Sequence, residues 1–359
     1  MGCRRFSLGR THSLSGYRVN ERESKLKHQK FSSVTASIPA SSANLGPGFD
    51  VHSIALQSPK LKLEVALRPE GTRIIELGGT YKNDSTTDPN VNAAGKALDN
   101  LLSLFEKSVG YQVKIDVEIP PRKGLGLSGA ESVGAVVCAN RLLKLGLDGR
   151  RIVEMAGAAE PSQHMDNVSA SGLGGFNIAY LNPINKQVQF TTLMPPTDLG
   201  VAIIVPNIEK KSTAETRRLI PSTVTKANYI ASMSYVSVIS ASFAQKDVES
   251  ILATLPWDFV IEAARADGGA YGDGVTSSFL QEEKQVLEER YHVAETISGA
   301  GPSRALWFSI RQDAKTKKRN RLGLIKPAVE FVSERFEALG HKVQQVYITK
   351  PSKTGAVIV

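Results

Sequence analysis

The chain has 359 residues, of which 41% are hydrophobic and 22% are charged, with 30 glycines and 17 prolines. This composition is typical of globular proteins and excludes a chain disordered throughout, a collagen and a coiled coil. No apolar run approaches the roughly 18 residues needed to cross a bilayer, which excludes an integral membrane protein. The two cysteines, Cys3 and Cys138, are too few for a disulfide framework or a four-thiolate zinc site, so we expect a cytoplasmic protein.

The net charge of +9 is concentrated at the start of the chain. Residues 1–33 contain eight Lys or Arg and two Glu, which gives them a charge of +6 and leaves only +3 for the rest. A body with so little excess charge does not indicate nucleic-acid binding. Because residues 1–33 are polar, rich in Ser and without hydrophobic periodicity, we expect a disordered basic extension. An organellar transit peptide stays open for this segment.

From residue 34 on, apolar residues follow the spacing of strands and helices. In chain order, the pattern predicts strands over residues 60–67 and 73–77, a helix over 90–105, a strand over 111–119 and a long helix over 128–145. Beyond Pro195 and Pro196 it predicts a strand over 201–205, helices over 212–219, 226–244, 247–255 and 282–290, strands over 292–297 and 305–310, a helix over 327–339 and a strand over 343–348. The alternating strands are typical of antiparallel sheets. We therefore expect two α+β domains, residues 34–195 and 196–359.

A glycine-rich turn joins the strand that ends at residue 119 to the helix that begins at residue 128. Its sequence over residues 120–130 is Pro-Pro-Arg-Lys-Gly-Leu-Gly-Leu-Ser-Gly-Ala. Glycines let the backbone approach a ligand closely, and a helix start offers unpaired N–H groups and a positive dipole end. We therefore expect this turn to hold a phosphate group. From these residues alone, a plain structural turn stays open.

Three widespread motifs fit this turn poorly. Gly124, Gly126 and Gly129 match the G-x-G-x-x-G of dinucleotide-binding folds, but the strand before them alternates instead of being continuously apolar. A Walker A loop needs Gly-Lys followed by Ser or Thr, which this chain lacks. A nucleophile elbow needs a glycine where Ala130 stands. The dinucleotide, P-loop and hydrolase interpretations are therefore set aside.

The turn resembles the phosphate-binding motif of the GHMP kinases, P-x-x-x-G-L-G-S-S-A-A. Four further segments resemble motifs of that family in the expected order, and they are residues 39–50, 164–168 with 174–176, 212–217 with Pro221, and 298–303. The first of them is similar to the homoserine kinase form P-A-x-S-A-N-L-G-x-G-F-D, and the two middle segments are similar to that branch as well. The matches span most of the chain, which therefore resembles the archaeal-like homoserine kinase branch of the GHMP kinases.

The resemblance implies a fold and a function. The fold is the two-domain α+β GHMP kinase fold, with a first half similar to ribosomal S5 domain 2, a ferredoxin-like second half and the active site in a cleft. The function is transfer of phosphate from ATP to the hydroxyl of L-homoserine, which gives O-phospho-L-homoserine for threonine biosynthesis. The family further implies a homodimer without nucleic-acid or membrane partners. A pantoate- or mevalonate-type kinase, or an inactive GHMP-fold sensor, stays open.

The resemblance also assigns residues to ATP and to Mg²⁺. The residues that would bind ATP are those of the turn: Pro120, Pro121, Arg122, Lys123, Gly124, Leu125, Gly126, Leu127, Ser128, Gly129 and Ala130. Mg²⁺ would be held by Ser128 and Glu160. Two features depart from the family, because Leu127 replaces the first serine of the motif and Glu160 lies only four residues before His164. Local sequence alone leaves a capping serine and a solvated glutamate equally open.

The acceptor would be a zwitterion, whose carboxylate fits a guanidinium and whose ammonium fits a carboxylate or amide oxygen. By resemblance, the residues that bind it are Asn44, Asp50, His164, Thr213, Arg217 and Arg265. The two arginines would take the carboxylate, and Thr213 lies one helical turn before Arg217. A loose phosphoryl-transfer transition state tolerates the absence of a strong base. We therefore favour orientation of the hydroxyl by Asn167 over base catalysis by Asp166.

Overall fold

The structure is a computed structural model that describes residues 32–160, 165–185, 187–209, 212–311 and 322–359. Almost all of the extension expected over residues 1–33, and also His164, lie outside the described residues. From Ser33 to Val359 the chain forms one compact unit. Within the described ranges, none of the helices has the length and apolar character that a membrane span requires.

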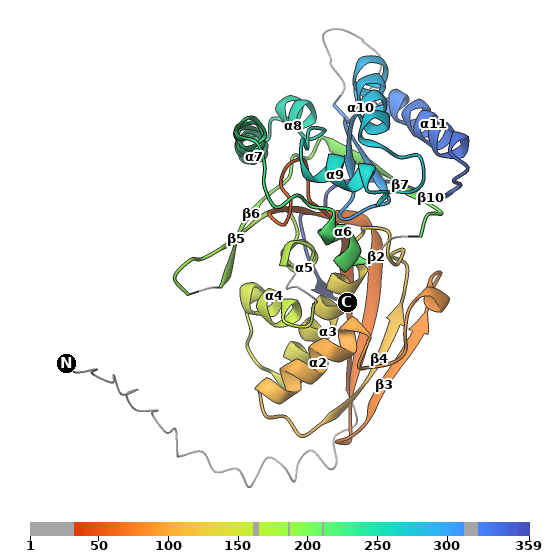
Figure 1. The fold of residues 1–359 in the computed structure, drawn as a ribbon. Helices are drawn as coiled ribbons and strands as arrows, with labels where there is room; N and C mark the ends of the chain where they lie inside the picture. The colour runs from red at the N-terminus through yellow and green to blue at the C-terminus, as the bar shows by residue number, and fades with distance from the viewer. Residues whose placement is uncertain (1–31, 161–164, 186, 210–211, 312–321) are drawn as a thin grey trace, which may run out of the picture. The chain divides into compact units, whose positions relative to one another are not determined.

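The larger of two sheets is built mainly from the first half of the chain (Figure 1). In the part of the chain that the structure describes, its strands follow the order β11-β1-β2-β4-β3, and β5 and β6 extend from β2. They are β1 (Ser33–Ala43), β2 (His52–Arg68), β3 (Arg73–Gly78), β4 (Gly110–Asp116), β5 (Phe176–Leu181), β6 (Val188–Leu193) and β11 (Val357–Ile358). On β4, Val113 and Ile115 are buried and Lys114 is exposed, as the alternation predicts.

One pair of strands departs from the antiparallel arrangement that the alternation predicts. β3 and β4 run parallel, with Arg73 opposite Tyr111 and Gly78 opposite Asp116. The segment between them contains α2 (Ala93–Leu104) and provides the crossover that a parallel pair needs. Alternation reports which face of a strand is buried but not the direction of its neighbour.

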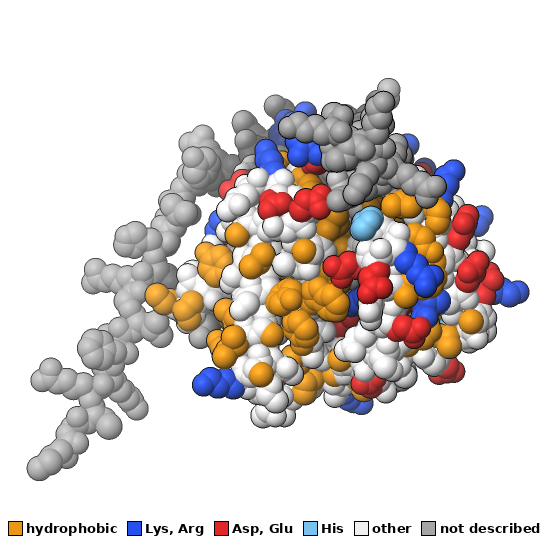
Figure 2. All heavy atoms as spheres, turned by 90° about the horizontal axis from the view of Figure 1, so that it is seen from above, with side chains coloured by type: hydrophobic (Ala, Val, Ile, Leu, Met, Phe, Trp, Pro, Cys, Tyr) orange, Lys and Arg blue, Asp and Glu red, His pale blue; other side chains and the backbone are white. Residues whose placement is uncertain are grey.

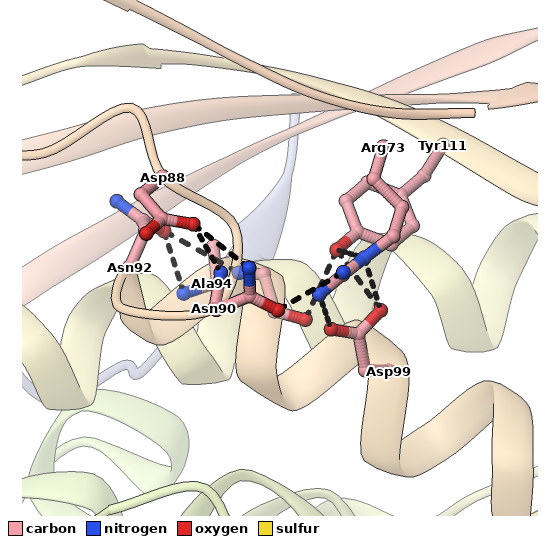
Figure 3. Close-up of polar contacts among 8 residues, drawn as sticks. Arg73, Asp88, Asn90, Asn92, Ala94, Asp99 and Tyr111 are labelled. Carbon is pink, nitrogen blue, oxygen red and sulfur yellow. Dashed lines mark hydrogen bonds and ion pairs between the residues drawn. The ribbon is translucent and has the colours of Figure 1, made fainter. Parts of the chain in front are cut away.

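Among the described residues, the helices α2, α3 (Leu127–Leu143), α4 (Gly149–Gly157) and α5 (Met165–Leu173) accompany this first sheet. α3 packs on β1 and β2 and against the other three helices. Figure 3 shows how α2 begins, with Asn92 beside Ala94. The Asn92 side chain accepts hydrogen bonds from the backbone N–H groups of Ala94 and Gly95. Further along α2, Asp99 pairs with Arg73 of β3. The cap therefore fixes the start of α2, and the ion pair holds the middle of the helix to the sheet.

The second sheet is antiparallel throughout, in the order β10-β7-β9-β8. Its strands are β7 (Leu199–Pro206), β8 (Ala294–Ile297), β9 (Arg304–Ser309) and β10 (Val343–Thr349). The accompanying helices are α6 (Thr213–Arg218), α7 (Lys226–Gln245), α8 (Val248–Thr254), α9 (Ile261–Asp267), α10 (Ser277–Val286) and α11 (Leu322–Ala338), with the short helical turn η3 (Leu287–Tyr291). Another short helical turn, η1 (Lys82–Asp84), contacts β3 of the first sheet. Every residue of β7 is buried, which explains its continuous apolar run.

The face at the top of Figure 1 carries α7, α8, α10 and α11. Figure 2 looks onto this face and shows hydrophobic side chains gathered in patches among acidic and basic groups. Exposed large hydrophobic residues include Tyr229, Ile230, Met233 and Val238 of α7, and no charged residue occurs from Ala227 to Gln245. α7 therefore exposes an uncharged and partly apolar surface.

Candidate active site

A cleft of about 770 Å³ is lined by segments that lie far apart in the sequence. The lining residues are Asn44, Phe49, Asp50, those at 83–86, 91–93 and 96, those at 120–122, 124–129 and 131, those at 159–160 and 166–168, Arg217, Arg265, Gly299 and Ala300. Each of the segments that resemble GHMP kinase motifs contributes to this list. The fold thus brings the five matching segments to a single site.

The glycine-rich turn forms one wall of the cleft. Gly126, at a φ of +69°, occupies the cap position of α3, and no side chain caps the helix there. Gly124 has a φ of +74°, and a Cβ on it would lie 1.9 Å from the carbonyl oxygen of Ser298, so only glycine fits. The Ser298 hydroxyl donates to the Gly124 carbonyl at 2.9 Å. The turn is therefore held from behind, and the amides at the start of α3 are free of a side-chain cap.

Not all residues of the turn face the cleft. Nine of the eleven from Pro120 to Ala130, all of which the structure describes, line it, and Lys123 and Ala130 do not. Ala130 belongs to the hydrophobic core. The Lys123 ammonium donates to the carbonyl oxygen of Ile208 at 2.7 Å, and burial lowers its pKa. The geometry gives no support to a nucleotide contact by these two side chains.

Ser128 and Glu160 meet beside the turn. The hydroxyls of Ser128 and Ser132 donate to the two carboxylate oxygens of Glu160, at 2.9 and 3.0 Å. Glu160 is buried; its burial raises the pKa of the carboxyl, and the two serine hydrogen bonds lower it. The capping serine and the solvated glutamate that local sequence left open are both wrong, because Gly126 caps α3 and Glu160 is only 9% exposed.

Two arginines share an aromatic ring at another part of the cleft. The guanidinium carbons of Arg217 and Arg265 lie 5.4 and 4.9 Å from the centre of the Phe49 ring. Arg217 Nη2 donates to both carboxylate oxygens of Asp50, at 3.0 and 2.8 Å. Arg265 is only 3% exposed, and within the described residues its guanidinium makes no hydrogen bond or ion pair. A buried guanidinium in this state is prepared for an anionic ligand.

Asn44 connects the first motif to the last. It has a φ of +60°, its side-chain oxygen accepts from the Asp50 backbone N–H, and its amide donates to the Gly299 carbonyl, both at 3.0 Å. Its polar atoms are thus already engaged, and they position Asp50 beside Arg217. Thr213 is the first residue of α6, four positions before Arg217. His164 lies outside the described residues.

Asp166 and Asn167 lie between the turn and the arginines. Asp166 accepts a hydrogen bond from the Asn167 backbone N–H at 2.7 Å, and Asn167 Oδ1 accepts from the Ser41 hydroxyl at 3.0 Å. A Cβ on Gly126 would lie 3.0 Å from that same Asn167 oxygen. Burial, with a smaller contribution from Asp50, raises the pKa of Asp166 to about 6, although the Asn167 amide and Arg217 act in the opposite direction.

The motifs did not predict a second carboxylate on this wall. Glu131 is 5% exposed, and its Oε1 has no hydrogen-bond partner within the described residues. Burial raises its pKa to about 8, with Glu160 adding to the effect, while the Ala93 backbone and the Asn92 side chain lower it. Helical spacing could have found this residue, since it lies three positions after Ser128 and so on the same face of α3.

Known proteins are similar to this chain in sequence and in fold. Residues 92–175 match the GHMP kinases N terminal domain. The chain is 28% identical over 334 residues to the homoserine kinase of Pyrococcus abyssi, covering 88% of this chain and 96% of that protein. It is 30% identical over 289 residues to the homoserine kinase of Sulfolobus acidocaldarius, covering 79% and 89%. The chain belongs to the homoserine kinase family of the GHMP kinases.

A solved structure of this family agrees in fold. The crystal structure of a homoserine kinase from Cytophaga hutchinsonii superimposes with a TM-score of 0.76 at 21% identity, covering 92% of this chain and 99% of that one. The α+β GHMP kinase fold predicted from the sequence is therefore confirmed. The family membership predicted from the five motifs is confirmed as well.

Proposed function

We propose that this protein is a homoserine kinase, which transfers the γ-phosphoryl group of ATP to the hydroxyl of L-homoserine and releases ADP and O-phospho-L-homoserine. The observation that carries the proposal is the buried guanidinium of Arg265, without an internal partner among the described residues, in the same cleft as the anion-binding turn. The cleft thus provides for two anionic groups, a phosphate chain and a carboxylate. The Arg217–Asp50 pair adds a carboxylate for an ammonium.

The nucleotide would lie along the turn, with its phosphates at the amides that open α3. GHMP kinases use ATP, and the donor set beside the turn suits Mg²⁺. Ser128 and Glu160 offer one hydroxyl and one carboxylate, and no cluster of three or more His, Cys, Asp or Glu that could hold a metal occurs within the described ranges. Mg²⁺ takes one or two protein carboxylates and completes its shell with phosphates and water. The cation would neutralise charge on the phosphates during transfer.

The acceptor would lie between the turn and the arginines. Arg265 and Arg217 would bind its carboxylate, and Asp50, held by Asn44, would bind its ammonium. Asn167 lies against the turn and would orient the hydroxyl toward the γ-phosphate. We keep orientation ahead of base catalysis, because the Asp166 carboxylate is engaged with the Asn167 backbone amide. Positioning of this kind supplies much of the rate enhancement in phosphoryl transfer.

Other features stay proposals from the family resemblance. These are acceptor contacts by His164 and Thr213, a homodimer and a cytoplasmic location. We also propose the division into residues 34–195 and 196–359. It has support from the second sheet, whose four strands all lie in the later range, although β11 returns from that range to pair with β1.

The proposal is tested by offering purified protein with MgATP four alcohols: L-homoserine, pantoate, mevalonate and shikimate. We expect ADP release with L-homoserine alone. Turnover with another alcohol but not with homoserine would replace the acceptor, and ATP binding without any turnover would indicate an inactive sensor. As a site test, Arg217→Ala should raise the KM for homoserine strongly and leave the KM for ATP nearly unchanged. An equal loss for both substrates would remove Arg217 from the acceptor pocket.

A further inference from the structure

The first two turns of α3 present three polar side chains to one side. They are Ser128, Glu131 and Ser132. Glu131 follows Ser128 by three residues and Ser132 follows it by four, so all three lie on the same face of the helix. Ser128 and Ser132 hold the Glu160 carboxylate through one oxygen each. Glu131 and Glu160 both line the cleft, and the charge of Glu160 raises the cost of ionising Glu131. Two carboxylates therefore share one wall beside the phosphate turn.

The environment of Glu131 is unusual for a structural residue. It is only 5% exposed, yet Oε1 has no hydrogen-bond partner within the described residues. Those residues also give Glu131 no ion pair, although Lys96 lines the same cleft. Ionising a carboxyl in this environment is costly, and a cationic partner or a metal ion offsets that cost. Glu131 thus lines the same wall of the cleft as Ser128 and Glu160, whose oxygens could bind a cation.

We propose that Glu131 is a second carboxylate ligand of the divalent cation, and that together with Glu160 and Ser128 it forms a site that binds Mg²⁺ or Mn²⁺ before the nucleotide arrives. The donors are all oxygens, which suit hard cations. Two carboxylates balance the charge of a divalent ion without phosphates. With Ser128 and Glu160 alone, the remaining positive charge would have to be balanced by the phosphates of ATP. The role of the cation in ATP binding rests on the proposed function. The binding of the ion to the protein does not depend on that function.

A purely structural role for Glu131 is the competing explanation. Its carboxyl lies near the start of α2, where the Ala93 backbone and the Asn92 side chain interact with it, and Figure 3 shows Asn92 capping that helix. Glu131→Gln separates the two roles. The amide keeps the size of the side chain and an acceptor oxygen for the Ala93 backbone, but it removes the charge that a cation requires.

The test is titration of nucleotide-free protein with Mn²⁺, with the free ion followed by electron paramagnetic resonance. We expect one site in the unaltered protein and at least tenfold weaker binding in Glu131→Gln and in Glu160→Gln. Glu70→Gln, which alters an exposed residue in the turn between β2 and β3, is the matched control and should bind like the unaltered protein. A thermal melt shows that each variant is folded, and Mn²⁺ should raise the melting temperature of the unaltered protein more than that of Glu131→Gln.

Two results would overturn the proposal. One is equal Mn²⁺ affinity in Glu131→Gln and the unaltered protein. The other is Mn²⁺ binding that appears only after a non-hydrolysable ATP analogue is added. Homoserine turnover in either case would leave the proposed function standing. Conversely, Mn²⁺ binding that depends on Glu131 in a protein that does not phosphorylate homoserine would support the cation site and overturn only the function.

Discussion

Two groups of buried charged side chains in the described part of the chain differ in how they are paired. Beside the second sheet, Arg304 Nε lies 2.9 Å from Glu295 and 3.3 Å from Glu283, and both acids are almost fully buried. In the cleft, Glu131, Asp166 and Arg265 are buried almost as deeply, but within the described residues none of them forms an ion pair. Burial alone therefore does not separate the two groups, whereas pairing does.

Arg304 and Arg265 make the comparison sharp. Each places its guanidinium 4.9 Å from the centre of a phenylalanine ring, Phe336 for Arg304 and Phe49 for Arg265. Arg304 is held by two acids and by the Pro302 carbonyl, so its charge is compensated inside the protein. Arg265 opens onto a cleft instead. Uncompensated buried charge marks a place where a ligand supplies the partner, and compensated charge belongs to the fold.

The largest expected effect is on stability, from Arg304→Met. Removing the cation leaves Glu283 and Glu295 buried beside each other, which should lower the free energy of unfolding by about 3–5 kcal/mol. Urea denaturation measures the change. Arg311→Met is the control, because Arg311 pairs with Asp198 at an 83% exposed position and should cost less than about 1 kcal/mol. A loss below about 1 kcal/mol for Arg304→Met would show that this cluster is not structural.

The next effect concerns Asp166 and pH. Burial raises the pKa of Asp166 from 3.8 to about 6, so the folded state holds a proton that the unfolded state releases between these pH values. Its contribution to stability is full below pH 3.8 and is lost as pH rises through 6, a change of about 3 kcal/mol. An asparagine side chain at this position has no such proton to lose, so Asp166→Asn should gain this amount relative to the unaltered protein between about pH 4 and pH 7. Urea denaturation at both pH values checks it, and a stability difference independent of pH would contradict it.

Arg265→Met should separate binding from stability. Because Arg265 has no ion pair within the described residues, we expect the free energy of unfolding to change by less than about 1 kcal/mol. The KM for homoserine should rise about tenfold or more, since a charge-assisted hydrogen bond contributes about 1.5–3 kcal/mol. Steady-state kinetics and urea denaturation measure the two quantities. Arg265→Lys should restore little, because an ammonium lacks the planar fork of a guanidinium. Destabilisation as large as that of Arg304→Met would contradict the comparison.

The sequence predicted the strongly periodic elements well. The helix expected over residues 128–145 is α3, and the strand expected over residues 201–205 lies inside β7. α5 was missed because its sequence, Met-Asp-Asn-Val-Ser-Ala-Ser-Gly-Leu, contains few large apolar residues at helical spacing. It is helical because tertiary packing against β1, β2 and α3 stabilises it.

The site was predicted less completely, because motifs report backbone positions and not the directions of side chains. Ser128, Glu160, Asn167 and Arg217 all reach the cleft. Glu131 was missed because Glu160 lies just after α4, and only the folded structure shows that this segment comes close to Glu131. Glu131 and Arg265 indicate a ligand site because they are buried without an internal partner among the described residues. Both properties arise only when the chain is folded.

The smallest effect tests two adjacent basic residues of the turn. Arg122 is exposed and lines the cleft, so Arg122→Ala should raise the KM for ATP about two- to fivefold, as expected for a screened charge near phosphates. Lys123 donates instead to the Ile208 carbonyl, away from the cleft lining, so Lys123→Ala should change the KM for ATP by less than about twofold. Steady-state kinetics at saturating homoserine compares the pair. A larger effect for Lys123 would mean that its ammonium leaves the Ile208 carbonyl and moves toward the phosphates when the nucleotide binds.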